Sequence, residues 1–121
     1  MERLMSIAAE LGVRVMHGAL PAENGIYYRD LGLVVLHVGL SETLELCTLA
    51  HELGHAHHGH TDTSEASEFA ANRFAARLLI DDREYAAAEG MSDSPLFIAQ
   101  ELGVTLALVR AYLPSGASVR A

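Results

Sequence analysis

Residues 51–55 read His51-Glu52-Leu53-Gly54-His55, and the chemistry of the chain is best approached from them. The pattern is H-E-x-x-H, which puts two histidines and a carboxylate at the spacing that binds and activates zinc on one helix. A helix turns about 100° per residue, so that positions i and i+4 lie about 40° apart on one face. His51 and His55 can therefore bind one metal ion together. Glu52 lies one step round the helix, where it can reach a water on that ion as a general base but is poorly placed to be a third ligand.

The residues on either side of the motif predict that it lies within a helix over 42–58. Ser41 is a good N-cap, and acidic residues in the next turn complement the helix dipole. Gly59 is a natural helix end. The face that packs on the core is predicted by the i, i+3, i+4, i+7 spacing of Leu46, Leu49, Ala50 and Leu53.

The segments before and after this helix predict an α+β fold. A short helix over 4–11 comes first, and β-forming residues then predict strands over 13–17, 26–29 and 33–38. Asp30-Leu31-Gly32 is typical of a short hairpin turn, and an edge strand over 33–38 could pair with an extended substrate chain. Capping residues after the motif predict helices over 62–80, 81–89, 94–103 and 105–114. We expect a small antiparallel sheet of about three strands packed on a helical bundle, with a zincin-like metal helix.

The third metal ligand must come from outside the motif, because catalytic zinc usually has three protein ligands and one water. The next helix offers Glu65 and Glu68, and we favour Glu68 because Asn72 follows it at i+4. Asn72 could accept a hydrogen bond from the far nitrogen of His51 or His55 and fix its tautomer. Two neutral imidazoles and one carboxylate leave a positive site that lowers the pKa of a bound water toward about 7. The predicted reaction is hydrolysis of an amide, with a peptide bond as the favoured target.

Some assignments stay open at this point. His58 lies about one turn beyond the motif and is a minor alternative ligand, and Cys47, one turn before it, could approach the site although a small buried residue is the expected role. His57 and His60 are expected to be helix-end and loop histidines. The donor that stabilises the oxyanion stays open among Tyr27, Tyr28, Tyr85 and the histidines.

The motif and the sequence after it together resemble the ImmA/IrrE family of zinc metallopeptidases. The resemblance rests on Leu49-Ala50-His51-Glu52-Leu53-Gly54-His55, then Gly59-His60, then Glu68-x-x-x-Asn72-x-Phe74-Ala75-Ala76-x-Leu78-Leu79. Ala70 departs from the family, which often has an acid there, and so does Ile80, because a proline commonly follows the Leu-Leu pair. The resemblance implies one metallopeptidase domain over 1–114. The tail over 115–121 consists mostly of small residues and is expected to fray. The resemblance also implies a helix-turn-helix transcriptional repressor as substrate, with His51, His55 and Glu68 as zinc ligands and Glu52 as the general base.

Composition excludes several other classes of function. The chain has 121 residues, enough for one domain, and a net charge of −8 in which all eight cations are arginine. Such a protein lacks the charge needed for sequence-independent nucleic-acid binding and is repelled by anionic membranes. Residues 98–113 resemble a helix-turn-helix, but Arg110 is the only cation on the second helix, so a packed helical pair is expected. With one cysteine, no signal-peptide pattern and no long apolar run, we expect a cytoplasmic protein. The expected partner is a protein substrate, as the predicted peptide-bond hydrolysis and the family resemblance imply.

A second class of function stays open. The fold could be a non-enzymatic, partner-binding module in which the metal site is structural or absent. The fourth coordination position distinguishes the two, because a water there favours an enzyme and a fourth protein ligand favours a structural site.

Overall fold

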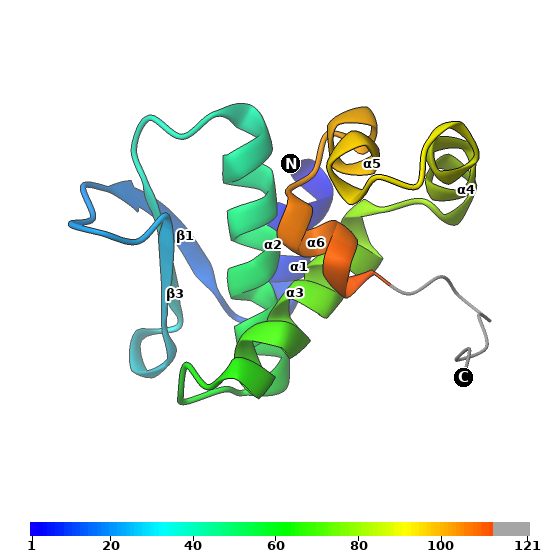
Figure 1. Cartoon of the computed structure of the whole chain (residues 1–121). Coiled ribbons are helices and arrows are strands. Elements are labelled where there is room, and N and C mark those ends of the chain that lie inside the picture. The colour runs from blue at the N-terminus through cyan, green and yellow to red at the C-terminus, as the bar shows by residue number, and fades with distance from the viewer. Residues whose placement is uncertain (113–121) are drawn as a thin grey trace.

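A computed structural model describes residues 1–112 of the chain, and in it a small sheet and several helices surround one central helix, α2 (Figure 1). The predicted tail over 115–121 lies outside the described residues. The strands are β1 (Arg14–Gly18), β2 (Gly25–Tyr28) and β3 (Leu33–His37), with a one-turn helix η1 (Arg29–Leu31) between β2 and β3. The helices are α1 (Glu2–Glu10), α2 (Glu42–His58), α3 (Glu65–Leu79), α4 (Asp82–Met91), α5 (Pro95–Leu102) and α6 (Leu106–Ala111).

The fold is α+β with three strands, as predicted, but the sheet is mixed rather than antiparallel. The strand order is β1-β3-β2. β2 and β3 form the expected antiparallel hairpin, with Gly25 opposite Leu36, and Gly32 closes the turn in the left-handed region at φ 55°. β1 pairs with β3 in parallel, with Arg14 opposite Leu33. The prediction of an all-antiparallel sheet was therefore wrong for β1.

The physical reason for this error lies in the connection between β1 and β2. The alternation of side chains along a strand defines which residues share a face, but it carries no information about which strand is the neighbour. Residues 19–24 carry the chain across to the other side of β3, and the backbone N–H of His37 donates to the carbonyl of Asn24 at 2.7 Å. This crossing leaves β2, rather than β3, at the edge of the sheet next to α2.

Helix α2 is held in place on several sides and at both ends. The Oγ of Ser41 accepts a hydrogen bond from the backbone N–H of Leu44 at 3.2 Å, and Gly59 ends the helix at φ 67°. Fully buried residues from α2, β3 and α3 pack together around the helix: Leu49, Ala50, Leu53, Val34, Leu36, Ala71, Ala75 and Ala76. Burying one leucine side chain is worth about 1.5–3 kcal/mol, so this packing strongly restrains the motif.

The later helices complete the core. α3 begins at Glu65 with Ser64 as its N-cap, later than the predicted start at residue 62. Asp62 lies before the helix, where it accepts hydrogen bonds from the backbone N–H of Ser64 and the hydroxyl of Ser67. α6 packs against α3 and α5 and buries Leu108, Val109 and Ala111. None of the described helices combines the length and apolar character needed to cross a bilayer.

Candidate metal centre

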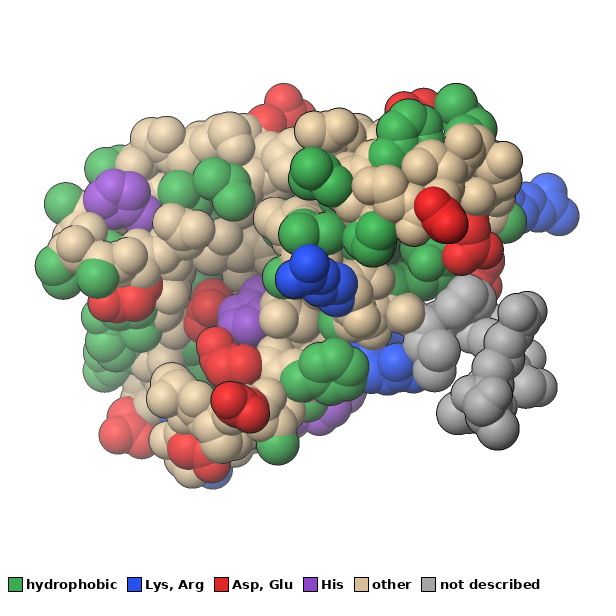
Figure 2. All heavy atoms as spheres, viewed as in Figure 1, with side chains coloured by type: hydrophobic (Ala, Val, Ile, Leu, Met, Phe, Trp, Pro, Cys, Tyr) green, Lys and Arg blue, Asp and Glu red, His purple; other side chains and the backbone are tan. Residues whose placement is uncertain are grey.

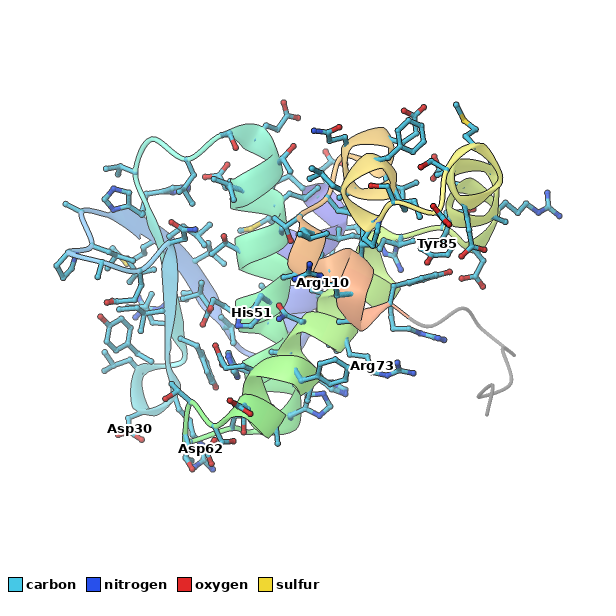
Figure 3. All side chains as sticks on the ribbon, in the orientation of Figure 1. Asp30, His51, Asp62, Arg73, Tyr85 and Arg110 are labelled. Atoms are coloured by element: carbon cyan, nitrogen blue, oxygen red, sulfur yellow. The ribbon has the colours of Figure 1, made fainter. Side chains whose placement is uncertain are left out.

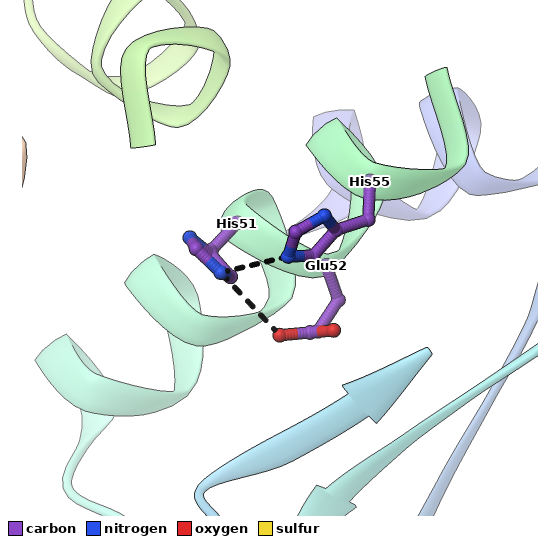
Figure 4. Close-up of side chains that lie close together, drawn as sticks. All are labelled: His51, Glu52 and His55. Atoms are coloured by element: carbon purple, nitrogen blue, oxygen red, sulfur yellow. Dashed lines mark hydrogen bonds and ion pairs between the residues drawn. The ribbon is translucent and has the colours of Figure 1, made fainter. Parts of the chain in front are cut away.

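The two histidines of the motif present the same ring nitrogen to each other on α2. Nε2 of His51 lies 3.1 Å from Nε2 of His55, and Oε2 of Glu52 lies 3.8 Å from Nε2 of His51 (Figure 4). Glu52 and His55 are buried, with 8% and 7% of their surface exposed. Polar atoms gathered under such cover are costly unless a shared partner compensates them. A cation bound between the two Nε2 atoms would be such a partner.

Helix α3 brings a second carboxylate to the same point. Oε2 of Glu68 lies 2.6 Å from Nε2 of His55, and its Oε1 lies 3.4 Å from Nε2 of His51. Oε2 is shielded from solvent, yet it makes no hydrogen bond of acceptable geometry. Buried carboxylate oxygens normally have such a partner. A carboxylate with one oxygen near each of the two imidazole nitrogens fits a metal ion, and this donor set suits zinc.

Two carboxylates therefore compete for the place of third ligand, and their geometry separates them. His51, Glu52 and His55 each offer one ligand atom, and these three atoms lie within 4.8 Å of one another. Glu52 is therefore near enough to be considered as the third ligand. The backbone N–H of Tyr27 on β2 donates a hydrogen bond to the Glu52 carboxylate, which ties it to the strand. Glu68, in contrast, has one oxygen near each histidine. Glu68 suits the role of ligand, and Glu52 suits a group that acts on a nearby water.

Close packing between α2 and α3 sets the position of Glu68. A Cβ atom at Gly54 would lie 2.9 Å from both the Cα and the carbonyl oxygen of Ala71, and 3.2 Å from the Cβ of Phe74. A residue with a side chain at position 54 would force the helices apart. Because Ala71 follows Glu68 by one turn, the glycine inside the motif permits the approach that brings the carboxylate to the histidines.

The outer nitrogen of each motif histidine also has a partner. Nδ1 of His51 lies 2.7 Å from Oδ1 of Asn72, and Nδ1 of His55 lies 2.9 Å from Nδ1 of His60. Asn72 lies where the spacing from Glu68 placed it. His60 was expected to be an ordinary loop histidine, and the sequence signal for its position is the glycine before it, which turns the chain back at the end of α2.

Burial and neighbouring charges shift the pKa values of two groups here. Burial, followed by the charge of the nearby Glu68 carboxylate, raises the pKa of Glu52 to about 8, and the N–H of Tyr27 opposes the rise. Burial, followed by the charge of His51, lowers the pKa of His55. The imidazole of His55 is thereby kept neutral, which is the form that binds metal. The carboxyl of Glu52 can take up and release a proton near neutral pH.

The site opens into a cleft of about 930 Å³. Figure 2 shows histidine and acidic side chains gathered in a hollow between the sheet and the helices, and Figure 3 places Asp30 and Asp62 at one end with His51 deeper in. The walls come from β2, η1, the 60–63 loop, Glu52, His55 and Glu68. β3 is the central strand, so the predicted substrate-pairing edge over 33–38 was wrong; the edge strand at this cleft is β2.

β2 lies directly against α2 at Gly25. A Cβ atom there would lie 2.6 Å from Cγ2 of Thr48 and 3.4 Å from Cγ of Glu52. Only a residue without a side chain leaves this contact undisturbed, and the contact places the wall of the cleft beside the Glu52 carboxylate.

The remaining candidates from the sequence lie elsewhere or contribute differently. Cys47 is buried and hydrogen-bonded to Thr105, and the exposed ring of His58 stacks on that of His60 at 5.1 Å. Of the tyrosines considered as oxyanion donors, Tyr27 and Tyr28 line the cleft. The ring of Tyr85 instead lies on α4, 4.4 Å from that of Tyr112.

Comparison with known proteins agrees with this geometry. The family described as the IrrE N-terminal-like domain matches residues 3–113, whereas no curated protein matches the chain. The fold is similar to that of a solved Mycobacterium tuberculosis transcriptional regulator, with a TM-score of 0.59 and 17% sequence identity over 92% of this chain. The chain spans only 40% of that protein, and at this identity the likeness shows the fold alone. Because the family match covers almost all residues, including the motif and the helix after it, the chain belongs to the IrrE N-terminal-like domain family of peptidases, the ImmA/IrrE family that its motifs resemble.

Proposed function

We propose that the protein is a zinc-dependent endopeptidase that hydrolyses a peptide bond in a protein substrate. His51, His55 and Glu68 are the proposed zinc ligands, Glu52 is the proposed general base, and Asn72 orients His51. The observation that carries the proposal is the Glu68 carboxylate, which comes from a separate helix and places Oε2 2.6 Å from Nε2 of His55 and Oε1 3.4 Å from Nε2 of His51 beside an open cleft.

The chemistry follows from the two kinds of group. Zinc bound there would polarise a substrate carbonyl and lower the pKa of a water molecule. Glu52 takes the proton of the attacking water on its carboxylate and delivers it to the nitrogen of the leaving amine. The hydrogen bond from the N–H of Tyr27 holds this carboxylate toward the cleft while it does so.

The shape and charge of the cleft support an extended, cationic segment as substrate. An edge strand such as β2 can pair with an extended chain through its free backbone groups. Among the residues lining the cleft, Glu23, Asp30 and Asp62 add to the carboxylates of the site, and Arg29 is the only cation. A helix-turn-helix repressor, as the family resemblance implies, would present such basic segments. We propose the cytoplasm, where repressors act, as the location.

The test uses the purified full chain with zinc and, as candidate substrates, helix-turn-helix repressors. Cleavage is followed by mass spectrometry, and zinc binding by competition with a chelator. We expect Glu52→Gln to retain zinc and to lose at least about a hundredfold in cleavage rate, because general-base catalysis typically contributes that much or more. Glu68→Ala should lose both zinc and cleavage. Glu65→Ala, an exposed acid one turn earlier on α3, is the matched control and should keep both.

Two results would contradict the proposal. If Glu52→Gln cut the substrate at the wild-type rate, Glu52 would not be the base, and if Glu68→Ala bound zinc normally, the ligand set would be wrong. The non-enzymatic alternative predicts a fourth protein ligand instead of a water. The two candidates for that ligand have other partners, because Cys47 is hydrogen-bonded to Thr105 and the ring of His58 stacks on that of His60.

A further inference from the structure

The end of α2 folds back on itself and returns the chain to His55. Gly59 adopts the left-handed conformation at φ 67°, and its N–H bonds to the carbonyl of Ala56. The backbone N–H of His60 then donates to the carbonyl of His55 at 3.0 Å. This is the six-to-one hydrogen bond of a Schellman helix ending, which fixes the residue after the glycine over the last turn. His60 therefore lies next to His55 for a reason built into the backbone.

The side chains of His55 and His60 meet through one ring nitrogen each, and a metal at the other nitrogen of His55 would fix which of its nitrogens carries the proton. Nδ1 of His55 lies 2.9 Å from Nδ1 of His60, and the two rings meet edge to face with centroids 5.1 Å apart. Nε2 of His55 faces His51 and Glu68. If Nε2 gives its lone pair to a metal, the neutral ring must hold its proton on Nδ1. Nδ1 of His60 then accepts a hydrogen bond from that N–H, and the neutral ring of His60 carries its own proton on Nε2.

We propose that His60 is a positioning residue for the metal centre: it accepts the hydrogen bond from Nδ1–H of His55 and so holds that ring in the tautomer and orientation that bind zinc through Nε2. His60 does for His55 what Asn72 does for His51, and the two partners come from different segments, one from the loop after α2 and one from α3. The inference rests on the metal site of the proposed function, but not on the peptidase activity.

The loop that carries His60 is itself held in place. Oδ1 of Asp62 accepts hydrogen bonds from the backbone N–H of Ser64 at 3.1 Å and from the hydroxyl of Ser67 at 2.7 Å. Ser64 is the N-cap of α3, the helix that carries Glu68. The hydrogen bonds of Asp62 therefore connect the loop that carries His60 to the start of the helix that carries Glu68, the proposed third ligand. This connection supports a role for His60 in preorganising the site.

The test measures zinc affinity by chelator competition, which needs no substrate. We expect His60→Ala to weaken zinc binding about 10–100-fold, the usual effect of removing such a partner. His60→Asn should restore most of that loss, because the side-chain oxygen of asparagine can occupy nearly the position of Nδ1. His58→Ala is the matched control, since His58 stacks on His60 but its exposed ring takes no part in the bond to His55, and it should bind zinc like the wild type.

Nitrogen NMR of histidine-labelled, zinc-loaded protein gives the second readout. The proposal requires that Nδ1 of His55 carries a proton in the wild type. It would be overturned if Nδ1 were the metal-bound nitrogen, if His60→Ala bound zinc as tightly as the wild type, or if His60→Asn were as weak as His60→Ala. A wild-type chain that binds no zinc would overturn it together with the metal site. Failure to cleave any repressor, with the affinity series intact, would refute the peptidase proposal alone.

Discussion

Replacing Gly54 with alanine tests whether the approach of α3 to α2 builds the metal centre. The new Cβ would lie 2.9 Å from the Cα and carbonyl oxygen of Ala71, whereas carbon atoms pack best at about 3.5–4.0 Å. The helices must therefore separate locally by roughly 0.6 Å or more. Metal–ligand distances tolerate only about 0.2 Å, so this displacement of Glu68 is about three times what the site allows.

The expected energies follow from the same geometry. Overpacking costs about 1–3 kcal/mol, and the better helix propensity of alanine returns about 1 kcal/mol. The metal-free protein should therefore lose no more than about 2 kcal/mol of stability. Zinc affinity should fall at least about tenfold, which corresponds to about 1.4 kcal/mol. The assays are urea unfolding of the metal-free protein and chelator competition for zinc.

Gly90→Ala is the matched control, because Gly90 lies within α4 and a Cβ there meets nothing within 4 Å. It should stabilise the protein by about 0.5–1 kcal/mol and leave zinc affinity unchanged. If Gly54→Ala behaved like Gly90→Ala in both assays, close packing at this position would not control the ligand geometry, and the reasoning would be refuted.

Three further predictions concern the strand, the pH and the metal. Gly25→Ala should reduce the cleavage rate at least about tenfold with little loss of zinc affinity, because its Cβ would lie 2.6 Å from Cγ2 of Thr48 and disturb Glu52. Adding Thr48→Ser removes that methyl group and should restore activity. A double variant no more active than Gly25→Ala would contradict this reasoning. In the metal-free protein the folded state holds the Glu52 proton more tightly than the unfolded chain, because the pKa of Glu52 is raised from 4.5 to about 8. The free energy of unfolding should therefore fall as the pH rises between these values, by at most about 5 kcal/mol, and then level off. Urea unfolding measured at several pH values across this range should show this fall in the wild type, and the part that comes from Glu52 should be absent in Glu52→Gln. Free zinc at 100 times its dissociation constant should stabilise the wild type by about 2.7 kcal/mol, measured by urea unfolding with and without chelator, and an equal gain in Glu68→Ala would count against the ligand set.

The elements around the motif were predictable because their signals are local. The capping serine, the helix-ending glycine and the apolar spacing all lie within α2, and the structure has the helix over Glu42–His58. The hairpin around Gly32 has a similarly local cause. The spacing after His55 also singled out Glu68 and Asn72 as candidates, and the structure brings both side chains to the motif histidines.

What the sequence left undetermined depends on contacts between distant segments. The order of the strands follows from how residues 19–24 cross β3, and no pattern within the strands records that crossing. His57, His58 and His60 look alike in sequence, and the backbone turn at Gly59 determines that His60 reaches His55. The tight contact of Gly25 with Thr48 likewise becomes visible only when β2 is placed on α2.

The proposed zinc ligands all come from α2 and α3, whereas β2 touches the site through Glu52. In the proposed enzyme, metal binding and turnover would therefore depend on different layers of the molecule. A shift of β2 away from α2 would disturb the general base and leave the three proposed ligands in place. The zinc content of a purified sample would then report how many metal centres are assembled, and would not report how many molecules are catalytically competent.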